Sequence, residues 1–168
     1  MSQFTRTVEG FFFPKLDARL LKRLVAVGVV CFLFFGLVCR PCIIQGESMR
    51  PTYKGMGFTF CWKPIYWVTK PRRGDVAILR MVGNKVFILK RIIALEGDTV
   101  EFRDGQLYLN GMKAEEPWET LGPCNWNLPP RTVEPGHVYV VGDNRSMEME
   151  EHIFGQIPAS RVLGMPLW

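Results

Sequence analysis

A run of 16 residues without a charge, Leu24–Cys39 (LVAVGVVCFLFFGLVC), is the feature that most limits how this chain can fold. A helix that crosses a bilayer usually needs about 20 apolar residues. Leu20 and Leu21 extend the run on one side, and Ile43 and Ile44 lie beyond its other end. The cations that can extend their charges to the two interfaces are Lys22, Arg23 and Arg40. The run therefore predicts a transmembrane helix.

A buried core helix and the apolar part of a cleaved signal peptide are alternative interpretations of this run. A core helix should carry a polar stripe, and Leu24–Cys39 has none. A signal peptide should end in small residues suited to cleavage, whereas this run ends in Cys39-Arg40-Pro41-Cys42. The sequence thus favours a retained anchor over residues 24–42.

Positive charge is concentrated before the apolar run. The net charge is +5, and five of the 21 basic residues precede the run. These residues are Arg6, Lys15, Arg19, Lys22 and Arg23, opposed there by Glu9 and Asp17. Because cationic flanks stay on the cytoplasmic side, residues 1–23 are predicted to be cytoplasmic and residues 43–168 to be exported across a bacterial inner membrane. This topology explains the basic flank without nucleic-acid binding, which the sequence disfavours.

The exported part has the pattern of short strands separated by turns. Segments rich in β-branched and aromatic residues predict strands at Gly57–Trp62, Asp75–Arg80, Val86–Leu95, His137–Val141 and around Ile153–Leu163. Thr99–Arg103 and Gln106–Asn110 flank Asp104-Gly105, which suits a type I′ hairpin turn. Glu115–Gly136 contains five prolines and is predicted to be a surface excursion. The predicted fold class is mainly β: an antiparallel β domain with one N-terminal transmembrane helix.

Two of the five cysteines would lie outside the membrane. Cys31, Cys39 and Cys42 lie in or beside the predicted anchor and are interpreted as packing residues. Cys61 and Cys124 would lie in the exported domain, where a disulfide could persist. A Cys61–Cys124 bridge and two free thiols therefore both stay open. Without a histidine cluster or further cysteine pairs downstream, neither a metal site nor a cofactor is predicted.

Two turns contain polar residues that could carry chemistry. In Gly46–Thr52 (GESMRPT), Pro51 disfavours a helical conformation of Arg50, so Ser48 lies on extended or turning backbone. Gly142–Ser146 (GDNRS) follows a predicted strand. Each segment also has a purely structural interpretation. Gly46–Thr52 could be a polar turn where the chain leaves the membrane, and Gly142–Ser146 could be an Asx turn.

Lys90 and Arg91 form the third group, inside a strand whose two faces both carry apolar residues. Lys90 shares its face with Ile88 and Ile92. A lysine in apolar surroundings has a lowered pKa and can act as a base near neutral pH. The alternative is an edge strand that uses cations against aggregation.

Taken together, these motifs resemble the type I signal peptidase family. The blocks occur in the family's order and cover the chain from about Gly46 onward: Ser48-Met49-Arg50-Pro51-Thr52, Arg73-Gly74-Asp75-Val76, Lys90–Asp98 (KRIIALEGD) and Gly142–Ser146. In size the chain is similar to the compact members, which lack a large second β domain, and among them to the conjugative-transfer (TraF-like) peptidases that mature pilin subunits.

The resemblance implies a serine endopeptidase that removes leader or signal segments from exported precursors through an acyl-enzyme. Ser48 matches the family's nucleophile and Lys90 its general base, and the Ser48 backbone N–H would donate to the oxyanion. Asp143 is expected to pair with Arg91 and to support the strand that carries Lys90. The expected partners are exported precursor polypeptides, pilin precursors among them, and membrane lipid. The substrate cleft is expected at Ile43, Ile44, Gln45, Met49 and Ile88.

The chain departs from the family's pattern at several positions. Gly46 stands where many bacterial members have a hydroxyl residue that supplies a second oxyanion donor, so either a water or another donor replaces that residue, or the oxyanion hole is weaker. Glu148, Glu150 and His152 stand where the family usually has serine, aspartate and arginine. Glu150 can replace an aspartate in an ion pair. Glu148 cannot replace a hydroxyl that orients a lysine, and a carboxylate near Lys90 would raise the pKa of the lysine.

Two functions of other classes stay open. A non-catalytic, membrane-anchored assembly factor of the same fold is favoured by Gly46 and Glu148 and disfavoured by the intact Ser48 and Lys90. An autoproteolytic repressor relative would share a Ser/Lys β fold. The apolar run Leu24–Cys39 and the missing helix-turn-helix region argue against a repressor.

Overall fold

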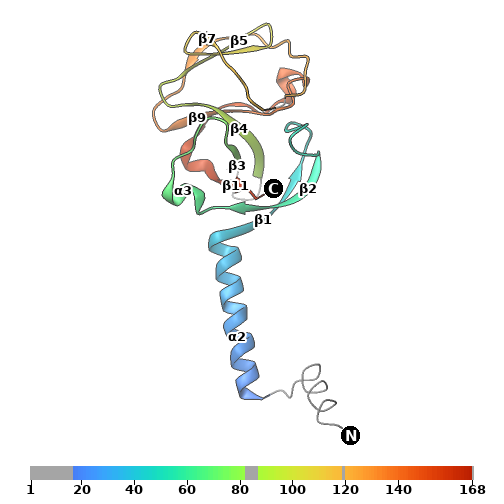
Figure 1. Cartoon of the computed structure of the whole chain (residues 1–168), viewed down its shortest axis with the longest axis vertical. Coiled ribbons are helices and arrows are strands. Elements are labelled where there is room, and N and C mark those ends of the chain that lie inside the picture. The colour runs from blue at the N-terminus through green and yellow to red at the C-terminus, as the bar shows by residue number, and fades with distance from the viewer. Residues whose placement is uncertain (1–16, 82–86, 119, 168) are drawn as a thin grey trace. The chain divides into compact units, whose positions relative to one another are not determined.

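The structure is a computed structural model that describes residues 17–81, 87–118 and 120–167. The chain divides into an N-terminal unit, residues 1–37, and a β unit, residues 38–168. Figure 1 shows a helix in the first unit and strands in the second. The predicted fold class, mainly antiparallel β with one apolar N-terminal helix, is confirmed.

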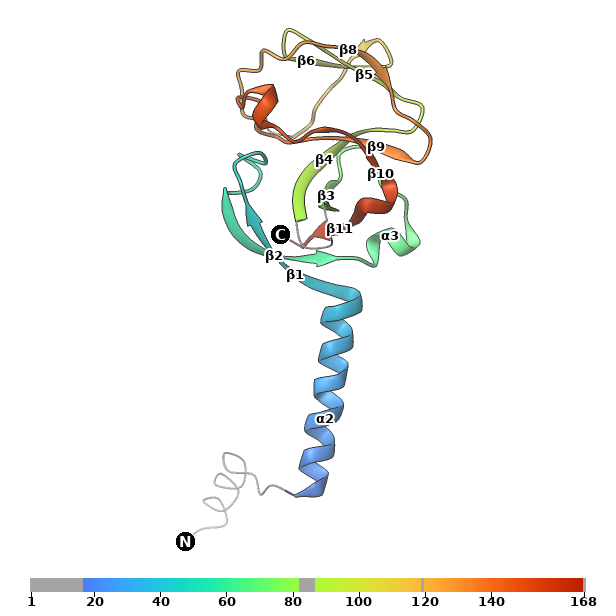
Figure 2. The same ribbon diagram turned by 180° about the vertical axis from the view of Figure 1, so that it is seen from behind.

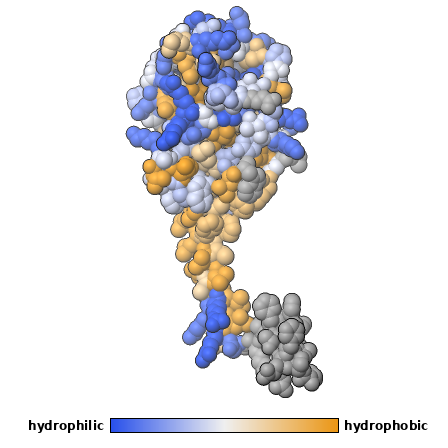
Figure 3. Space-filling view, viewed as in Figure 1, coloured by the Kyte–Doolittle hydropathy of each residue, from blue (hydrophilic) through white to orange (hydrophobic). Residues whose placement is uncertain are grey.

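The helix of the first unit, α2 (Ala18–Leu33), begins after Asp17, whose carboxylate accepts the Leu20 N–H at 2.7 Å. Such an N-cap satisfies one of the amide groups that the first turn leaves without a helical partner. The π-helical segment Phe34–Val38 continues α2, and the whole stretch spans 21 residues, within which a window of 18 residues has a mean hydropathy of 2.2. Figure 3 shows its apolar surface, with hydrophilic residues near its N-terminal end. Its length and composition suit a membrane span.

The bounds of this helical stretch differ from those of the predicted anchor, residues 24–42. The helix starts earlier, at Ala18, because the cations before the apolar run are good helix formers. It ends at Val38, and the chain then enters a strand in which Cys39 and Cys42 are buried. Hydropathy alone does not separate a spanning helix from a buried strand that follows it directly.

The β unit contains eleven strands among the described residues. The first six are β1 (Cys39–Gln45), β2 (Met56–Trp62), β3 (Val76–Arg80), β4 (Phe87–Leu95), β5 (Thr99–Arg103) and β6 (Gln106–Leu109). The others are β7 (Met112–Lys113), β8 (Leu128–Thr132), β9 (His137–Val141), β10 (Gly155–Pro158) and β11 (Val162–Pro166). Short helical turns are α3 (Ile65–Val68) and the 3-10 segments Met149–Glu151 and Ala159–Arg161.

The strands form two sheets in which every pair of neighbours is antiparallel. The seven-stranded sheet has the order β1-β2-β11-β3-β4-β9-β10, and the four-stranded sheet has the order β7-β6-β5-β8. Figures 1 and 2 show the four-stranded sheet and the β1–β2 pair at opposite ends of the β unit. Strand β4 therefore lies inside the larger sheet, and β1 lies at its edge.

Three clusters of buried apolar side chains fill the β unit, and β4 contributes to each of them. Ile93 packs with Phe102 and Trp126 in the cluster beneath the four-stranded sheet. Leu89 belongs to the second cluster, and Ile92 to the third. Since side chains in such cores pack at crystal-like density, β4 is held firmly from several sides.

Most of the predicted strands agree with the structure to within about two residues, except that Val86 lies outside the described residues. Asp104 and Gly105 both have positive φ, 47° and 74°, which confirms the predicted hairpin turn. A second turn of this kind, Asn110-Gly111 with φ of 54° and 81°, joins β6 to β7 and was not predicted. Strand β8 lies in the predicted excursion, and its two prolines are tolerated because β8 is an edge strand.

All five cysteines are free, so a Cys61–Cys124 disulfide is not part of the structure. Cys61 packs with Cys42 and Met49 in the second cluster, whereas Cys124 packs against the first. Burial raises the pKa of the Cys61 thiol to about 12. Because the thiolate is the reactive form, this thiol is a packing group.

Gly105 and Gly111, the glycines of the two hairpin turns, give a matched test of how closely the β5–β6 turn packs against the segment Glu115–Gly136. A Cβ on Gly105 would lie 1.9 Å from the Cys124 carbonyl oxygen, whereas a Cβ on Gly111 would meet nothing within 4 Å. Gly111→Ala should cost only the left-handed strain, about 1–2 kcal/mol, and Gly105→Ala about 1–3 kcal/mol more because of the clash. Urea denaturation in detergent, followed by tryptophan fluorescence, measures the difference. Equal losses of stability would contradict the close approach of Gly105 to Cys124.

Candidate active site

Ser48 lies in a tight turn that follows β1. The Gly46 N–H donates to the Gly55 oxygen at 2.9 Å, and the Tyr53 N–H donates to the Met49 oxygen at 2.8 Å. Met49, only 2% exposed, fixes the turn in the second core cluster. Because its neighbour is held in this way, half-buried Ser48 has a defined position at the end of the edge strand.

Lys90 lies in β4, opposite Ala77 of β3, and is 2% exposed. Because β4 is an inner strand, the interpretation of Lys90 as an edge-strand cation is wrong. Burial disfavours the ammonium form and lowers the pKa of Lys90 from 10.5 to about 8, against the opposing effect of Asp143. A large fraction of the amine is therefore neutral near pH 8.

One cavity of about 190 Å³ is lined by both Ser48 and Lys90. Of the predicted site residues, Ile44, Gly46, Met49 and Ile88 also line it, together with Glu47 and Leu89. Three further lining residues, which sequence reasoning missed, are Met147, Glu151 and Ile153. They flank or follow the last motif block, and an extension of that block beyond Ser146 would have included them.

A smaller cavity of about 20 Å³ shares Ile44, Ile88 and Leu89 with the first. Ile43 lines this smaller cavity and is otherwise exposed. Of Gln45, only its backbone position in β1 is described. The predicted cleft residues thus lie around two adjoining cavities between the end of β1 and β4.

The turn Gly142–Asn144 connects the segment that carries Ser48 to the strand that carries Lys90. The Asn144 N–H donates to the Ser48 carbonyl oxygen at 3.0 Å, and Asn144 Nδ2 donates to the Glu47 oxygen at 3.1 Å. On the other side, Arg91 Nε and Nη2 donate to the Asp143 carboxylate at 2.7 and 2.6 Å. The predicted Arg91–Asp143 pair is confirmed, and it is buried.

Additional contacts complete this ion pair. Arg91 Nη1 donates to the Gly74 oxygen at 2.7 Å, and the guanidinium lies over the Trp118 ring, 4.6 Å from its centroid. The Thr52 hydroxyl donates to Asp143 Oδ2. Such contacts offset the cost of burying two charges. They also join the Ser48 turn to Arg91, the neighbour of Lys90.

A hydroxyl group and a largely buried amine on the wall of one small cavity match the parts of a serine–lysine hydrolase. A family model described as signal peptidase, peptidase S26, matches residues 18–167. The chain belongs to this family. The signal peptidases are serine endopeptidases, and the apolar helix marks this member as a membrane-anchored enzyme.

Similar proteins come from bacteria and from a chloroplast. Signal peptidase I of Bacillus licheniformis is 32% identical over 86% of this chain and 83% of its own length. Thylakoidal processing peptidase 1 of Arabidopsis thaliana is 34% identical over 80% of this chain but only 43% of its own length. The crystal structure of a signal peptidase I from Enterococcus faecalis V583 is 29% identical and has a TM-score of 0.46, covering 58% of this chain and 97% of that one.

Gly46 lies in the same turn as Ser48, and its backbone N–H is already used. Its N–H is bonded to Gly55, so Gly46 does not supply an oxyanion donor. Its φ of +109° favours glycine and would strain a residue with a hydroxyl side chain. The Ser48 N–H, in contrast, has no acceptor among the described residues and stays available.

Among the described residues, Glu150 does not form the ion pair that the sequence suggested for it. Glu150 is exposed and forms no ion pair with a described residue. The buried Arg145 is paired with Glu116 of the excursion instead, and its Nε donates to the Gly142 oxygen at 2.9 Å. Glu148 is also exposed and does not line the cavity shared by Ser48 and Lys90. The carboxylate that acts on the pKa of Lys90 is therefore that of Asp143.

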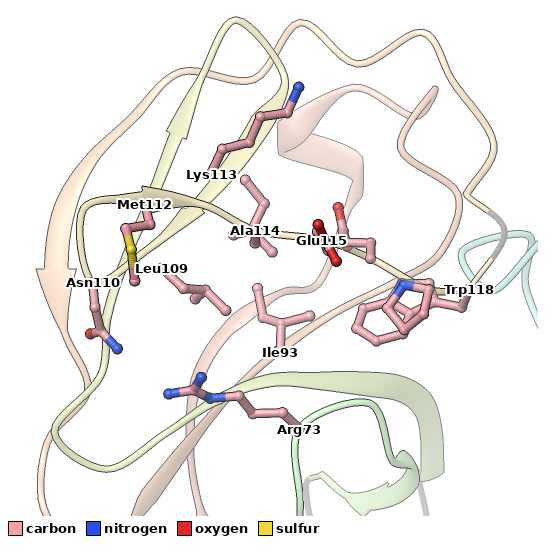
Figure 4. Close-up of a pocket in the computed structure, with 12 residues that line it drawn as sticks. Arg73, Ile93, Leu109, Asn110, Met112, Lys113, Ala114, Glu115 and Trp118 are labelled. Carbon is pink, nitrogen blue, oxygen red and sulfur yellow. The ribbon is translucent and has the colours of Figure 1, made fainter.

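A larger cavity, about 370 Å³, lies away from this signal peptidase site. Figure 4 shows it between Ile93 of β4 and the β6–β7 hairpin, with Arg73, Lys113 and Trp118 around it. Its lining contains no serine, cysteine or histidine, so it offers no such nucleophile. Within the described ranges, no three metal-ligating side chains come together, and no residue set for a metal or cofactor is identified.

The burial of Lys90 has a consequence for stability. Below pH 8 the folded chain must keep a charged amine in its interior, which costs about 3 kcal/mol for a pKa lowered by 2.5. Between pH 8 and 10.5 the unfolded chain still binds a proton that the folded chain has released, so stability rises with pH. Lys90→Met should therefore stabilise the fold by up to about 3 kcal/mol at pH 7 and much less near pH 10.

Urea denaturation in detergent at both pH values measures this effect. The exposed Lys113 provides a control, because Lys113→Met should give no pH-dependent change. If Lys90→Met lost stability at pH 7, or gained the same stability at both pH values, the buried Lys90 ammonium group would not be destabilising the fold as expected.

Proposed function

We propose that the chain is a signal peptidase that cleaves signal segments from exported precursors, with Ser48 as nucleophile and Lys90 as general base. The observation that carries the proposal is the shared cavity of Ser48 and Lys90, in which the lysine residue is 2% exposed and its amine has a pKa lowered to about 8. A base of this pKa is largely available under mildly alkaline conditions without help from histidine.

The proposed reaction uses these groups in two stages. Neutral Lys90 takes the proton of the Ser48 hydroxyl as its oxygen attacks the scissile carbonyl, and the Ser48 N–H donates to the oxyanion. The protonated amine then gives its proton to the leaving amine, which breaks the peptide bond and leaves an ester on Ser48. Water, deprotonated by Lys90, hydrolyses this ester and releases the second product.

The substrate is proposed to bind as an extended strand beside β1. Strand β1 is at the edge of its sheet, so its outer backbone groups can pair with an added strand. The adjoining cavity of about 20 Å³ is little larger than one water molecule requires. Small side chains near the scissile bond therefore fit best.

The membrane topology supports the same proposal. Since the basic flank precedes the helix, the positive-inside rule puts residues 1–23 in the cytoplasm and the β unit on the exported side of a bacterial inner membrane. Anchorage keeps the site close to precursors that emerge there, which raises their effective concentration. Pilin precursors of a conjugative system remain a candidate substrate on the sequence resemblance alone.

Replacing either dyad residue should abolish processing. Co-expression of candidate exported precursors with wild type, Ser48→Ala and Lys90→Ala, followed by intact-mass analysis of the products, gives the cut site and tests both residues. The loss should be at least about 10³-fold, because the members of a catalytic unit depend on one another. Exposed Ser160→Ala and Lys113→Ala are matched controls, for which we expect normal processing.

Formation of product by Ser48→Ala at the wild-type rate would refute the dyad. An uncut precursor in every sample would favour an assembly factor.

Activity should also depend on pH in a defined direction. The neutral amine is the active form, so kcat/KM should rise about tenfold per pH unit below pH 8 and level off above it. Steady-state cleavage of a precursor peptide between pH 5 and 9.5 measures this profile. A flat profile would exclude Lys90 as the base even if its replacement were inactive.

A further inference from the structure

His152 is a buried group that the dyad mechanism does not use. It follows the 3-10 segment Met149–Glu151 and is 4% exposed. Its Nε2 accepts the Gly142 N–H at 3.1 Å, so the ring proton is on Nδ1. Nδ1 is buried and has no hydrogen-bond partner among the described residues. A polar ring in this position needs an explanation.

The surroundings of His152 keep it neutral. Its ring makes an edge contact with Trp126, with centroids 4.9 Å apart, and a longer one with Phe154 at 6.0 Å. Burial, together with the charges of Lys90 on β4 and Arg145 after β9, lowers the pKa of His152 to about 3. The imidazole therefore remains a hydrogen-bond acceptor at every physiological pH.

Gly142 lies between His152 and the nucleophile segment. A Cβ on Gly142 would lie 2.1 Å from the Ser48 carbonyl oxygen and 2.3 Å from His152 Nε2. The glycine is required because both groups pack directly against its Cα. The same Ser48 oxygen accepts the Asn144 N–H, so the three residues from Gly142 to Asn144 are held by His152, Arg91 and the Ser48 segment.

We propose that His152 is a positioning residue of the peptidase: its neutral imidazole fixes the Gly142–Asn144 turn and thereby holds Ser48 against Lys90. The proposal rests on the proposed dyad function. A cationic side chain in this place could not accept the Gly142 N–H and would add a third positive charge beside Lys90 and Arg145. An apolar ring would fill the space but leave a buried N–H without an acceptor.

Two variants of His152 separate hydrogen bonding from packing. His152→Phe keeps a ring against Trp126 but removes the acceptor, whereas His152→Gln retains an oxygen that can accept the Gly142 N–H. His152→Phe should lower kcat by about 10- to 100-fold, the effect of a displacement on the order of 1 Å at the reacting atoms, with KM within about twofold since His152 itself does not line the cavity. His152→Gln should recover at least a third of the wild-type kcat (about threefold or less lost) because its oxygen restores the bond.

The full chain in detergent is used throughout, with His137→Phe as control, because His137 is the chain's other histidine and lies at the opposite end of β9 from Gly142. The pH midpoint of His152→Gln should match wild type. Wild-type kcat in His152→Phe would overturn the proposal. So would a His152→Gln variant that is as inactive as His152→Phe and has lost the pH dependence, since that result marks a proton-transfer role.

A second measurement does not depend on activity or on the folding of a variant. Nitrogen NMR of ¹⁵N-histidine-labelled wild type should show one imidazole with its proton on Nδ1 and no titration between pH 5 and 9. Titration of both histidines in that range, or a proton on Nε2 of both, would overturn the proposal. A parallel cleavage assay of Ser48→Ala distinguishes failure of the proposed dyad from failure of the proposed role of His152. If Ser48→Ala cleaves as well as wild type, the dyad is refuted. If His152→Phe cleaves as well as wild type, only the role of His152 is refuted.

Discussion

The ion pair between Arg91 and Asp143 is the interaction on which the site depends. Removing one member of such a buried pair typically costs about 3–5 kcal/mol, because the other charge is left without a partner. Here the cost would extend beyond stability. Arg91 is the chain neighbour of Lys90, and Asp143 is the chain neighbour of Asn144, which binds the Ser48 carbonyl oxygen. One ion pair therefore links the strand that carries Lys90 to the turn that carries Ser48.

Strand alternation separates two cations that are adjacent in sequence. Lys90 and Arg91 point to opposite faces of β4, so one lines the dyad cavity and the other meets Asp143. Lys90 has no ion-pair partner among the described residues and lies in apolar surroundings, which lowers its pKa. Arg91 is paired with Asp143. Arg91 thus supports the strand, and the Lys90 amine is left free to lose its proton.

Much of this arrangement could be predicted from local sequence patterns. Richness in β-branched and aromatic residues predicted the inner strands, and the motif blocks singled out Ser48, Lys90 and the Arg91–Asp143 pair. Asn110-Gly111 was missed although this dipeptide is a strong hairpin signal, because the second strand of its hairpin is only two residues long. The ion pair of Arg145 with Glu116 and the hydrogen bond from Gly46 to Gly55 depend on how separate segments pack together. The hydrophobic periodicity of a single segment does not show such contacts.

The order of the contacts along the chain has a consequence for biosynthesis. Ser48 and Lys90 leave the ribosome early, but the groups that align them, Asp143, Asn144 and His152, come from the last part of the described chain. A nascent chain that stops short of residue 152 carries both reactive groups without the frame that brings them together. The site can therefore form only after the segment that contains Asp143, Asn144 and His152 has been synthesised.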